Sequence, residues 1–207
     1  DVDEVLVEQI MHDIAQPTIS GMAAEGNPYV GVLFVGLMVT PQGIQVLEFN
    51  SRFGNPEALI IMRLLESDLV EAMLACINGR LSQTDVQISS QAAAAVMLTS
   101  PDYPAEQFPL GLPISGTVAA QQRAGIELFH HGTAISNGQL VTSRGRVLAV
   151  SAKGVDLQTA VCQAYSAVHH IHFEGAHYRR DIGVTPHTSP PLLIPFWPAA
   201  APQFVTA

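Results

Sequence analysis

The sequence predicts an α+β protein made of two units with antiparallel strands. Helical periodicity fills residues 3–25 and 56–78, and a hairpin pattern lies between them at residues 29–50. Short β-like runs and one long helical pattern follow in residues 84–170. With 207 residues, 48% hydrophobic and 13% charged, the chain is globular and long enough for two small cores.

The first predicted unit, residues 1–82, begins with a helix. Apolar side chains recur on one helical face from Val5 to Ile14. Proline fits the first turn of a helix and glycine fits the position after the last turn. We therefore expect Pro17 to restart the helix and Gly26 to close it.

The rest of this unit combines a hairpin with a broken helix. The segment Thr40–Gly43, with the sequence Thr-Pro-Gln-Gly, predicts the hairpin turn. In the helical pattern of residues 56–78 we expect a break beside Ser67, whose hydroxyl would cap the second piece. Gly79 would end that piece.

The second predicted unit, residues 83–183, is a small α+β domain. Its expected strands are Ala92–Thr99, Ile126–His130 and Arg146–Val150, and its expected helix is Asp156–His170. From residue 184 to residue 207 the chain becomes rich in proline, which predicts an irregular tail.

Residues 46–57 carry the residue types of a metal site. Glu48 and Asn50 are two positions apart at the end of a predicted strand, so their side chains point to the same face. One carboxylate and one amide oxygen suit Mg²⁺, which prefers oxygen ligands and usually takes its others from substrate phosphates. Arg52 has the same parity and could bind phosphate oxygens. The alternative is an ordinary strand, turn and helix with a charged rim.

The residues that follow predict the start of a helix. Asn55 is a capping residue type, Pro56 suits the first helical position, and Glu57 places an acid in the first turn.

Residues 46–57 resemble the metal-binding signature of the glycinamide ribonucleotide synthetases (phosphoribosylamine–glycine ligases), a family of ATP-grasp enzymes. The resemblance extends over roughly residues 5–183. Further segments follow the order that this family shows: Pro17-Thr18, Gly21–Gly26, Gly36–Met38, Ser67–Leu69, His131–Thr133, Gly145–Leu148 and Tyr178–Gly183. The resemblance implies the C-terminal half of an ATP-grasp fold, with antiparallel strands and packed helices, followed by a small α+β C-terminal domain.

The resemblance also implies a role for each residue of the signature. Glu48 and Asn50 would be the ligands of Mg²⁺ or Mn²⁺, and Arg52 would stabilise the transferred phosphoryl group. Asn55 and Glu57 would bind substrate.

The reaction implied is the ligation of glycine to 5-phosphoribosylamine with ATP, through glycyl phosphate, in cytoplasmic de novo purine biosynthesis. Lys153 is the only lysine, and no glycine-rich phosphate loop occurs in the sequence. We therefore expect an upstream, N-terminal portion of the enzyme to hold the nucleotide. The chain also opens without methionine, as a fragment would, and we expect it to be inactive alone.

Three positions depart from the family pattern. Asn55 replaces an aspartate, and Ala58 and Leu59 replace threonine and glutamine. These changes are either tolerated in a working ligase or mark a diverged, non-catalytic ATP-grasp remnant that acts as a binding module.

Composition excludes some classes of protein. A net charge of −9 with nine Lys and Arg argues against nucleic-acid binding, which depends on basic contacts to phosphate. No apolar run approaches the roughly 20 residues of a membrane span.

Cys76 and Cys162 are expected to be buried, reduced thiols in helices, which favours the cytoplasm. The clustered histidines lack the spacing of a zinc site and are expected at the surface or at an interface. For the run from Arg179 to Asp181, a phosphate contact and a charged turn both remain open.

Overall fold

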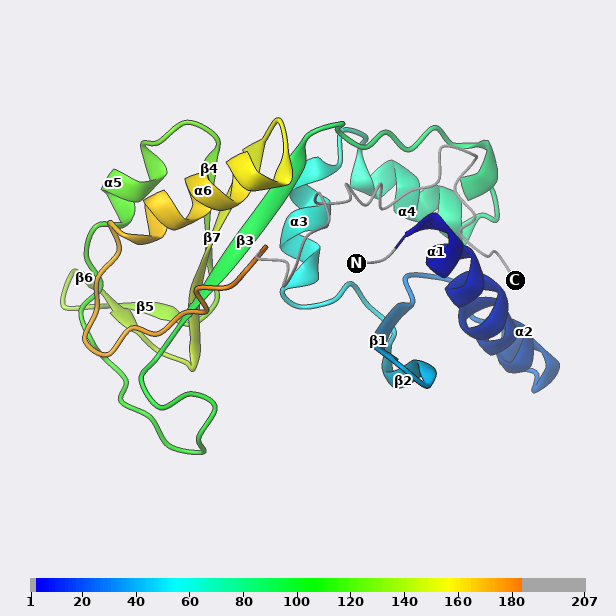
Figure 1. Ribbon diagram of the computed structural model, residues 1–207, viewed down its shortest axis with the longest axis horizontal. Coiled ribbons are helices and arrows are strands. Elements are labelled where there is room, and N and C mark those ends of the chain that lie inside the picture. Colours follow the sequence, from blue (N-terminus) through cyan, green and yellow to red (C-terminus); the bar gives the residue numbers. More distant parts are fainter. Residues whose placement is uncertain (1–2, 184–207) are drawn as a thin grey trace. The chain divides into compact units, whose positions relative to one another are not determined.

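The chain divides into two compact units in a computed structural model that describes residues 3–183 (Figure 1). Among the described residues, the first unit contains residues 3–58 and 65–88, and the second contains residues 59–64 and 89–183. The predicted proline-rich tail, 184–207, lies outside the described residues. The predicted boundary between residues 82 and 83 stays a prediction.

The first unit opens with two helical segments that a wider turn connects. They are α1 (Glu4–Ile10), the π-helical turn Met11–Ala15 and α2 (Gln16–Ala24). Pro17 lies in the first turn of α2. Proline has no N–H, and its ring excludes the carbonyl four residues earlier. The π turn, whose hydrogen bonds span five residues, lets the chain pass this point without leaving the helix. As expected, the helix ends before Gly26, which has φ +81°.

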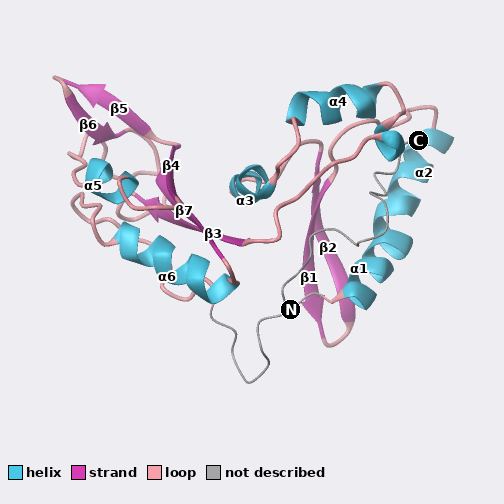
Figure 2. Ribbon diagram, turned by 90° about the horizontal axis from the view of Figure 1, so that it is seen from above, coloured by secondary structure: helices cyan, strands magenta, loops and turns pink. Residues whose placement is uncertain are grey.

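The predicted hairpin is confirmed. Strands β1 (Phe34–Thr40) and β2 (Gly43–Asn50) pair antiparallel around Pro41 and Gln42 (Figure 2). The register shifts once: Leu37 pairs with Val46, whereas Gly36 pairs with Glu48. Leu47 is therefore the extra residue of a β-bulge, and such bulges redirect the side chains beyond them.

The broken helix is confirmed as α3 (Glu57–Leu64) and α4 (Leu69–Ile77). The predicted cap was wrong, however. Asp68 caps α4 by accepting hydrogen bonds from the N–H groups of Val70 (2.7 Å) and Glu71 (3.2 Å). The Ser67 hydroxyl instead accepts a 2.6 Å bond from the N–H of Gln87, so it is occupied by a segment distant in sequence.

The second unit is built on a three-stranded antiparallel sheet. Its strand order is β3 (Ala92–Thr99), β7 (Arg146–Gly154) and β4 (Ile126–His130). Helix α6 (Leu157–Val168) packs on β3 and β7, as Figure 1 shows. Leu148 and Val150 in the central strand are fully buried, and Ala164 and Val168 cover the sheet from α6. All of these strands and the helix were predicted.

Three short elements of this unit were not predicted. They are α5 (Thr117–Gln121) and the hairpin of β5 (Thr133–Ser136) with β6 (Gln139–Thr142). The hairpin turns at Asn137 and Gly138, both with positive φ. Asn-Gly is the usual sequence of such a turn.

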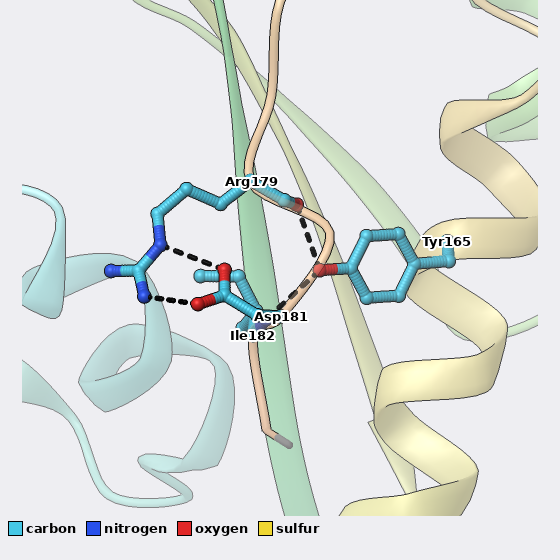
Figure 3. Close-up of polar contacts among 4 residues, drawn as sticks. All are labelled: Tyr165, Arg179, Asp181 and Ile182. Carbon is cyan, nitrogen blue, oxygen red and sulfur yellow. Dashed lines mark hydrogen bonds and ion pairs between the residues drawn. The ribbon is translucent and has the colours of Figure 1, made fainter.

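A hydroxyl group holds the segment that follows α6 (Figure 3). Tyr165 donates a 2.8 Å hydrogen bond to the carbonyl oxygen of Arg179 and accepts a 3.0 Å bond from the N–H of Ile182. Between these two points, Arg179 pairs with Asp181 through bonds of 2.9 and 2.7 Å. The segment is thereby attached to α6 at both ends of a short loop.

Both cysteines are free thiols, as expected, but only Cys76 is partly buried. Cys162 is exposed because it lies on α6 away from the buried positions Val161 and Ala164. Among residues 3–183, no helix has the length and apolar character that a membrane crossing requires.

Candidate active site

The end of β2 brings the two predicted metal ligands together. The Nδ2 atom of Asn50 donates a 2.9 Å hydrogen bond to Oε1 of Glu48, so the side chains share one face, as their spacing indicated. Glu48 is exposed and Asn50 is half-buried. Both side chains lie in the first unit, where a small ligand can approach the carboxylate.

Arg52 extends this row of side chains. Its guanidinium donates a 3.2 Å bond from Nη2 to Oδ1 of Asn50 and a 2.8 Å bond from Nη1 to the carbonyl oxygen of Phe53. A continuous line of hydrogen bonds therefore connects Arg52, Asn50 and Glu48. Arg52 itself is exposed. Its guanidinium can therefore release the Asn50 amide oxygen and bind a phosphate oxygen from solvent instead.

The chemistry of these donors fits a hard divalent cation. The Asn50 amide now presents its nitrogen to Glu48 and its oxygen to Arg52. A half-turn of the amide exchanges the two atoms, because they end the same planar group. The oxygen then lies beside the Glu48 carboxylate, which provides two oxygen ligands. Mg²⁺ is commonly held by one or two carboxylates together with water and phosphate oxygens.

Across residues 3–183, no group of three or more His, Cys, Asp or Glu side chains could hold a metal ion.

Gly36 leaves room for Glu48 on the neighbouring strand. A Cβ atom at Gly36 would lie 3.0 Å from Cγ of Glu48, closer than nearly all real contacts of this kind. The β-bulge at Leu47 is what places these two residues opposite each other.

The turn between β2 and α3 places the remaining predicted residues. The Gly54 carbonyl accepts a 3.0 Å bond from the N–H of Ala58, and α3 begins at Glu57. A Cβ atom at Gly54 would collide with Oε2 of Glu57, so this carboxylate folds back over the turn. Asn55 is exposed beside it. The capping role of Asn55, and substrate binding by Asn55 and Glu57, stay predictions.

The other polar clusters serve the second unit. His172 pairs with Ser115 and His177 pairs with Thr99 through backbone hydrogen bonds, while the side chains of both histidines are exposed. The bidentate partner of Arg179 is Asp181, whose pKa is lowered by these hydrogen bonds and by the positive charge. This geometry is that of a charged turn.

Three residues that surround the site were not identified as site residues from the sequence. Gly36 and Gly54 belong to the quoted motifs, but their sequence neighbours give no sign of what approaches them. The third is Phe34, whose ring lies 2.6 Å from the position of a Cβ atom at Gly54. Its partner in the sheet depends on a bulge that the sequence pattern does not reveal.

Comparison with known families shows which family the chain belongs to. Residues 2–58 match the family described as phosphoribosylglycinamide synthetase, ATP-grasp (A) domain. Residues 93–185 match phosphoribosylglycinamide synthetase, C domain. The chain belongs to the phosphoribosylglycinamide synthetase family. The strands and helices within residues 2–58 therefore belong to an ATP-grasp domain and the α+β unit that follows belongs to the C domain of this family, as expected.

The chain is also similar in sequence to individual members of the family. The chain is 40% identical over 178 residues to phosphoribosylamine–glycine ligase of Agrobacterium fabrum, covering 86% of this chain and 41% of that ligase. It is 45% identical over 183 residues to trifunctional purine biosynthetic protein adenosine-3 of Gallus gallus, covering 88% of this chain and 18% of that protein.

The crystal structure of phosphoribosylamine–glycine ligase from Thermotoga maritima matches with a TM-score of 0.71 and 32% identity, covering 84% of this chain and 42% of that one. The chain thus spans about two fifths of the single ligases and about a fifth of the trifunctional protein.

Proposed function

We propose that this chain forms the metal-binding end of the active site of an ATP-dependent phosphoribosylamine–glycine ligase. The observation that supports this most is the hydrogen-bonded row of Glu48, Asn50 and Arg52 at the end of a strand in the ATP-grasp domain. The substrates would be ATP, glycine and 5-phosphoribosylamine, and the setting would be purine biosynthesis in the cytoplasm.

Two transfers would make up the reaction. The glycine carboxylate attacks the γ-phosphorus of ATP, and the bond to the bridging oxygen breaks, which gives glycyl phosphate and ADP. The amine of phosphoribosylamine then attacks the glycyl carbonyl, and phosphate leaves with its electron pair while the amine loses a proton. Little covalent chemistry falls to the protein in such a step, because positioning and charge stabilisation dominate.

Each residue of the site would have one task. Glu48 and Asn50 would hold Mg²⁺ or Mn²⁺, which would supply positive charge to offset the negative charge of the ATP phosphates. Arg52 would leave Asn50 and donate to the oxygens of the transferred group. Glu57 and Asn55 would contact substrate, with the Glu57 carboxylate attracting the glycine ammonium group.

The nucleotide would be held mainly by parts of the ligase outside this chain. The chain covers about two fifths of the single ligases, and Lys153 is its only lysine. We therefore expect no turnover from the 207-residue chain alone.

The test joins this chain to the remainder of the Agrobacterium fabrum ligase and follows ADP release. Release should require both glycine and phosphoribosylamine. Arg52→Ala should lower turnover about 10²–10³-fold, the usual effect of removing a preorganised group that stabilises developing charge. Arg80→Ala, at an exposed arginine outside the site, is the matched control and should leave turnover unchanged.

A second candidate is a non-catalytic binding module. The first turn of α3 favours it, because Ala58 and Leu59 offer no hydrogen-bonding side chains there. A joined protein that folds and binds ATP, yet gives no turnover even with Asn55→Asp, would support this candidate and contradict the ligase.

A further inference from the structure

Phe34 lies on the same face of the hairpin as the candidate metal ligands. In the observed register Phe34 pairs with Asn50, and Gly36 pairs with Glu48. Residues directly opposite each other in an antiparallel pair point to the same side of the sheet. One face of the hairpin therefore carries the side chains of Phe34, Asn50 and Glu48. Gly36 lies on the same face and has no side chain.

Two glycines make room for the ring of Phe34. A Cβ atom at Gly54 would lie 2.6 Å from Cε2 and 2.8 Å from Cδ2 of the ring, distances that real Cβ atoms essentially never show. A Cβ atom at Gly36 would lie 3.6 Å from Cε1, on the opposite edge of the ring. The ring is thus seated on Gly54 and reaches back to Gly36, so it connects the hairpin to the turn before α3.

The same two glycines contact the two candidate carboxylates. Gly36 faces Cγ of Glu48, and Gly54 faces Oε2 of Glu57. One edge of the Phe34 ring therefore lies beside Gly36, which faces Glu48. The other edge lies beside Gly54, which faces Glu57. An aromatic ring is rigid, so it fixes the separation between these two positions.

We propose that Phe34 is a positioning residue that sets the placement of Glu57 relative to the metal ligands Glu48 and Asn50. It acts through Gly36 and Gly54 and touches no substrate. The inference rests on the proposed metal site at the end of β2. Replacement of Phe34 by leucine removes the ring edge on Gly54 while it keeps an apolar side chain, so the turn loses its support.

The experiment titrates Mn²⁺, as a paramagnetic probe, into the isotopically labelled 207-residue chain and follows nuclear magnetic resonance signals. The first readout is the Mn²⁺ concentration that half-broadens the Asn50 side-chain amide. The second is the broadening of the Glu57 backbone amide relative to that of Asn50, which reports their relative distances from the ion.

Phe34→Leu should weaken Mn²⁺ binding about 10-fold, the lower end of the usual effect for residues that orient metal ligands. It should also change the ratio of the two broadenings. Phe34→Tyr keeps the ring and should preserve both readouts. Phe49→Leu is the matched control, because Phe49 pairs with Val35 on the opposite face of the same hairpin. It should leave the ratio unchanged.

Phe34→Met provides an independent test if Phe34→Leu unfolds the hairpin, because it also removes the ring edge on Gly54 while it keeps an apolar side chain and leaves Gly54 and Glu57 unchanged. It should change the ratio as well. If Phe34→Leu and Phe49→Leu both bind Mn²⁺ with the affinity of the native chain and show its broadening ratio, the positioning role of Phe34 is overturned. The proposed function would then still stand. Failure of Mn²⁺ to broaden Asn50 in the native chain would overturn the metal site itself, and this inference with it.

Discussion

Removal of one hydroxyl group should loosen the segment that follows α6. Tyr165→Phe keeps the ring, whose centroid lies 6.3 Å from that of Tyr178, but removes both hydrogen bonds to the backbone of Arg179 and Ile182. A typical hydrogen bond contributes about 0.5–1.5 kcal/mol. Arg179 is exposed and Tyr165 is half-buried, so water can reach the freed groups and limit the loss. We expect the free energy of unfolding to fall by about 1–2 kcal/mol.

Hydrogen exchange measures the loss of the Tyr165 hydrogen bond directly at the Ile182 amide. The Ile182 amide loses its acceptor, so its exchange should accelerate about 10-fold, the factor that corresponds to 1.4 kcal/mol. The midpoint of thermal unfolding should drop by about 4–8 °C per kcal/mol for a unit of this size. Tyr178→Phe is the control, because the Tyr178 hydroxyl forms no hydrogen bond within residues 3–183 and only its ring makes contacts there. Equal exchange at Ile182 in the two variants would refute the role assigned to Tyr165.

Three further predictions concern the second unit. Leu148→Ala should cost about 2–5 kcal/mol of unfolding free energy in urea titrations, because Leu148 is fully buried in the central strand, whereas Ile135→Ala at a 70% exposed position should cost little. Gly116→Ala should destabilise more than Gly138→Ala. Both glycines have left-handed φ angles, a conformation that costs other residues about 1–2 kcal/mol, but only the Gly116 Cβ would collide with a backbone carbonyl, that of His170. Burial and the Arg146 charge hold the pKa of His131 below its ordinary value of 6.5, so the unfolded chain binds the proton more readily and stability should fall as pH drops through that value. His131→Gln should flatten this dependence in unfolding measurements from about pH 7.5 to about pH 5.5, and an unchanged slope would contradict it.

The spacing of the site was predictable from sequence, but its surroundings were not. Glu48 and Asn50 share a face because residues two apart on a strand always do. Their neighbours on β1 depend on register. Counting back from the turn at Thr40 and Gly43 without a bulge would place Phe34 opposite Phe49, on the wrong face. The bulge at Leu47 moves Phe34 opposite Asn50, and no local sequence signal marks it.

Helix caps show the same limit. Ser67 and Asp68 are both capping residue types, and local sequence cannot choose between them. The choice is made by Gln87, whose N–H binds the Ser67 hydroxyl and leaves Asp68 to cap α4. The hairpin of β5 and β6 is a different case. Its Asn137-Gly138 turn was a usable signal, but the flanking strands are only four residues each and the pattern is correspondingly weak.

The most direct test of the metal site is ADP release by the joined ligase carrying Glu48→Gln, measured across a range of Mg²⁺ concentrations. The substitution keeps the shape of the side chain and removes the charge that would hold the cation. We predict turnover at least about 10²-fold lower, with a higher Mg²⁺ requirement, while Glu8→Gln on α1 changes neither. Normal turnover and an unchanged Mg²⁺ requirement in Glu48→Gln would contradict the assignment of this strand end as the metal site.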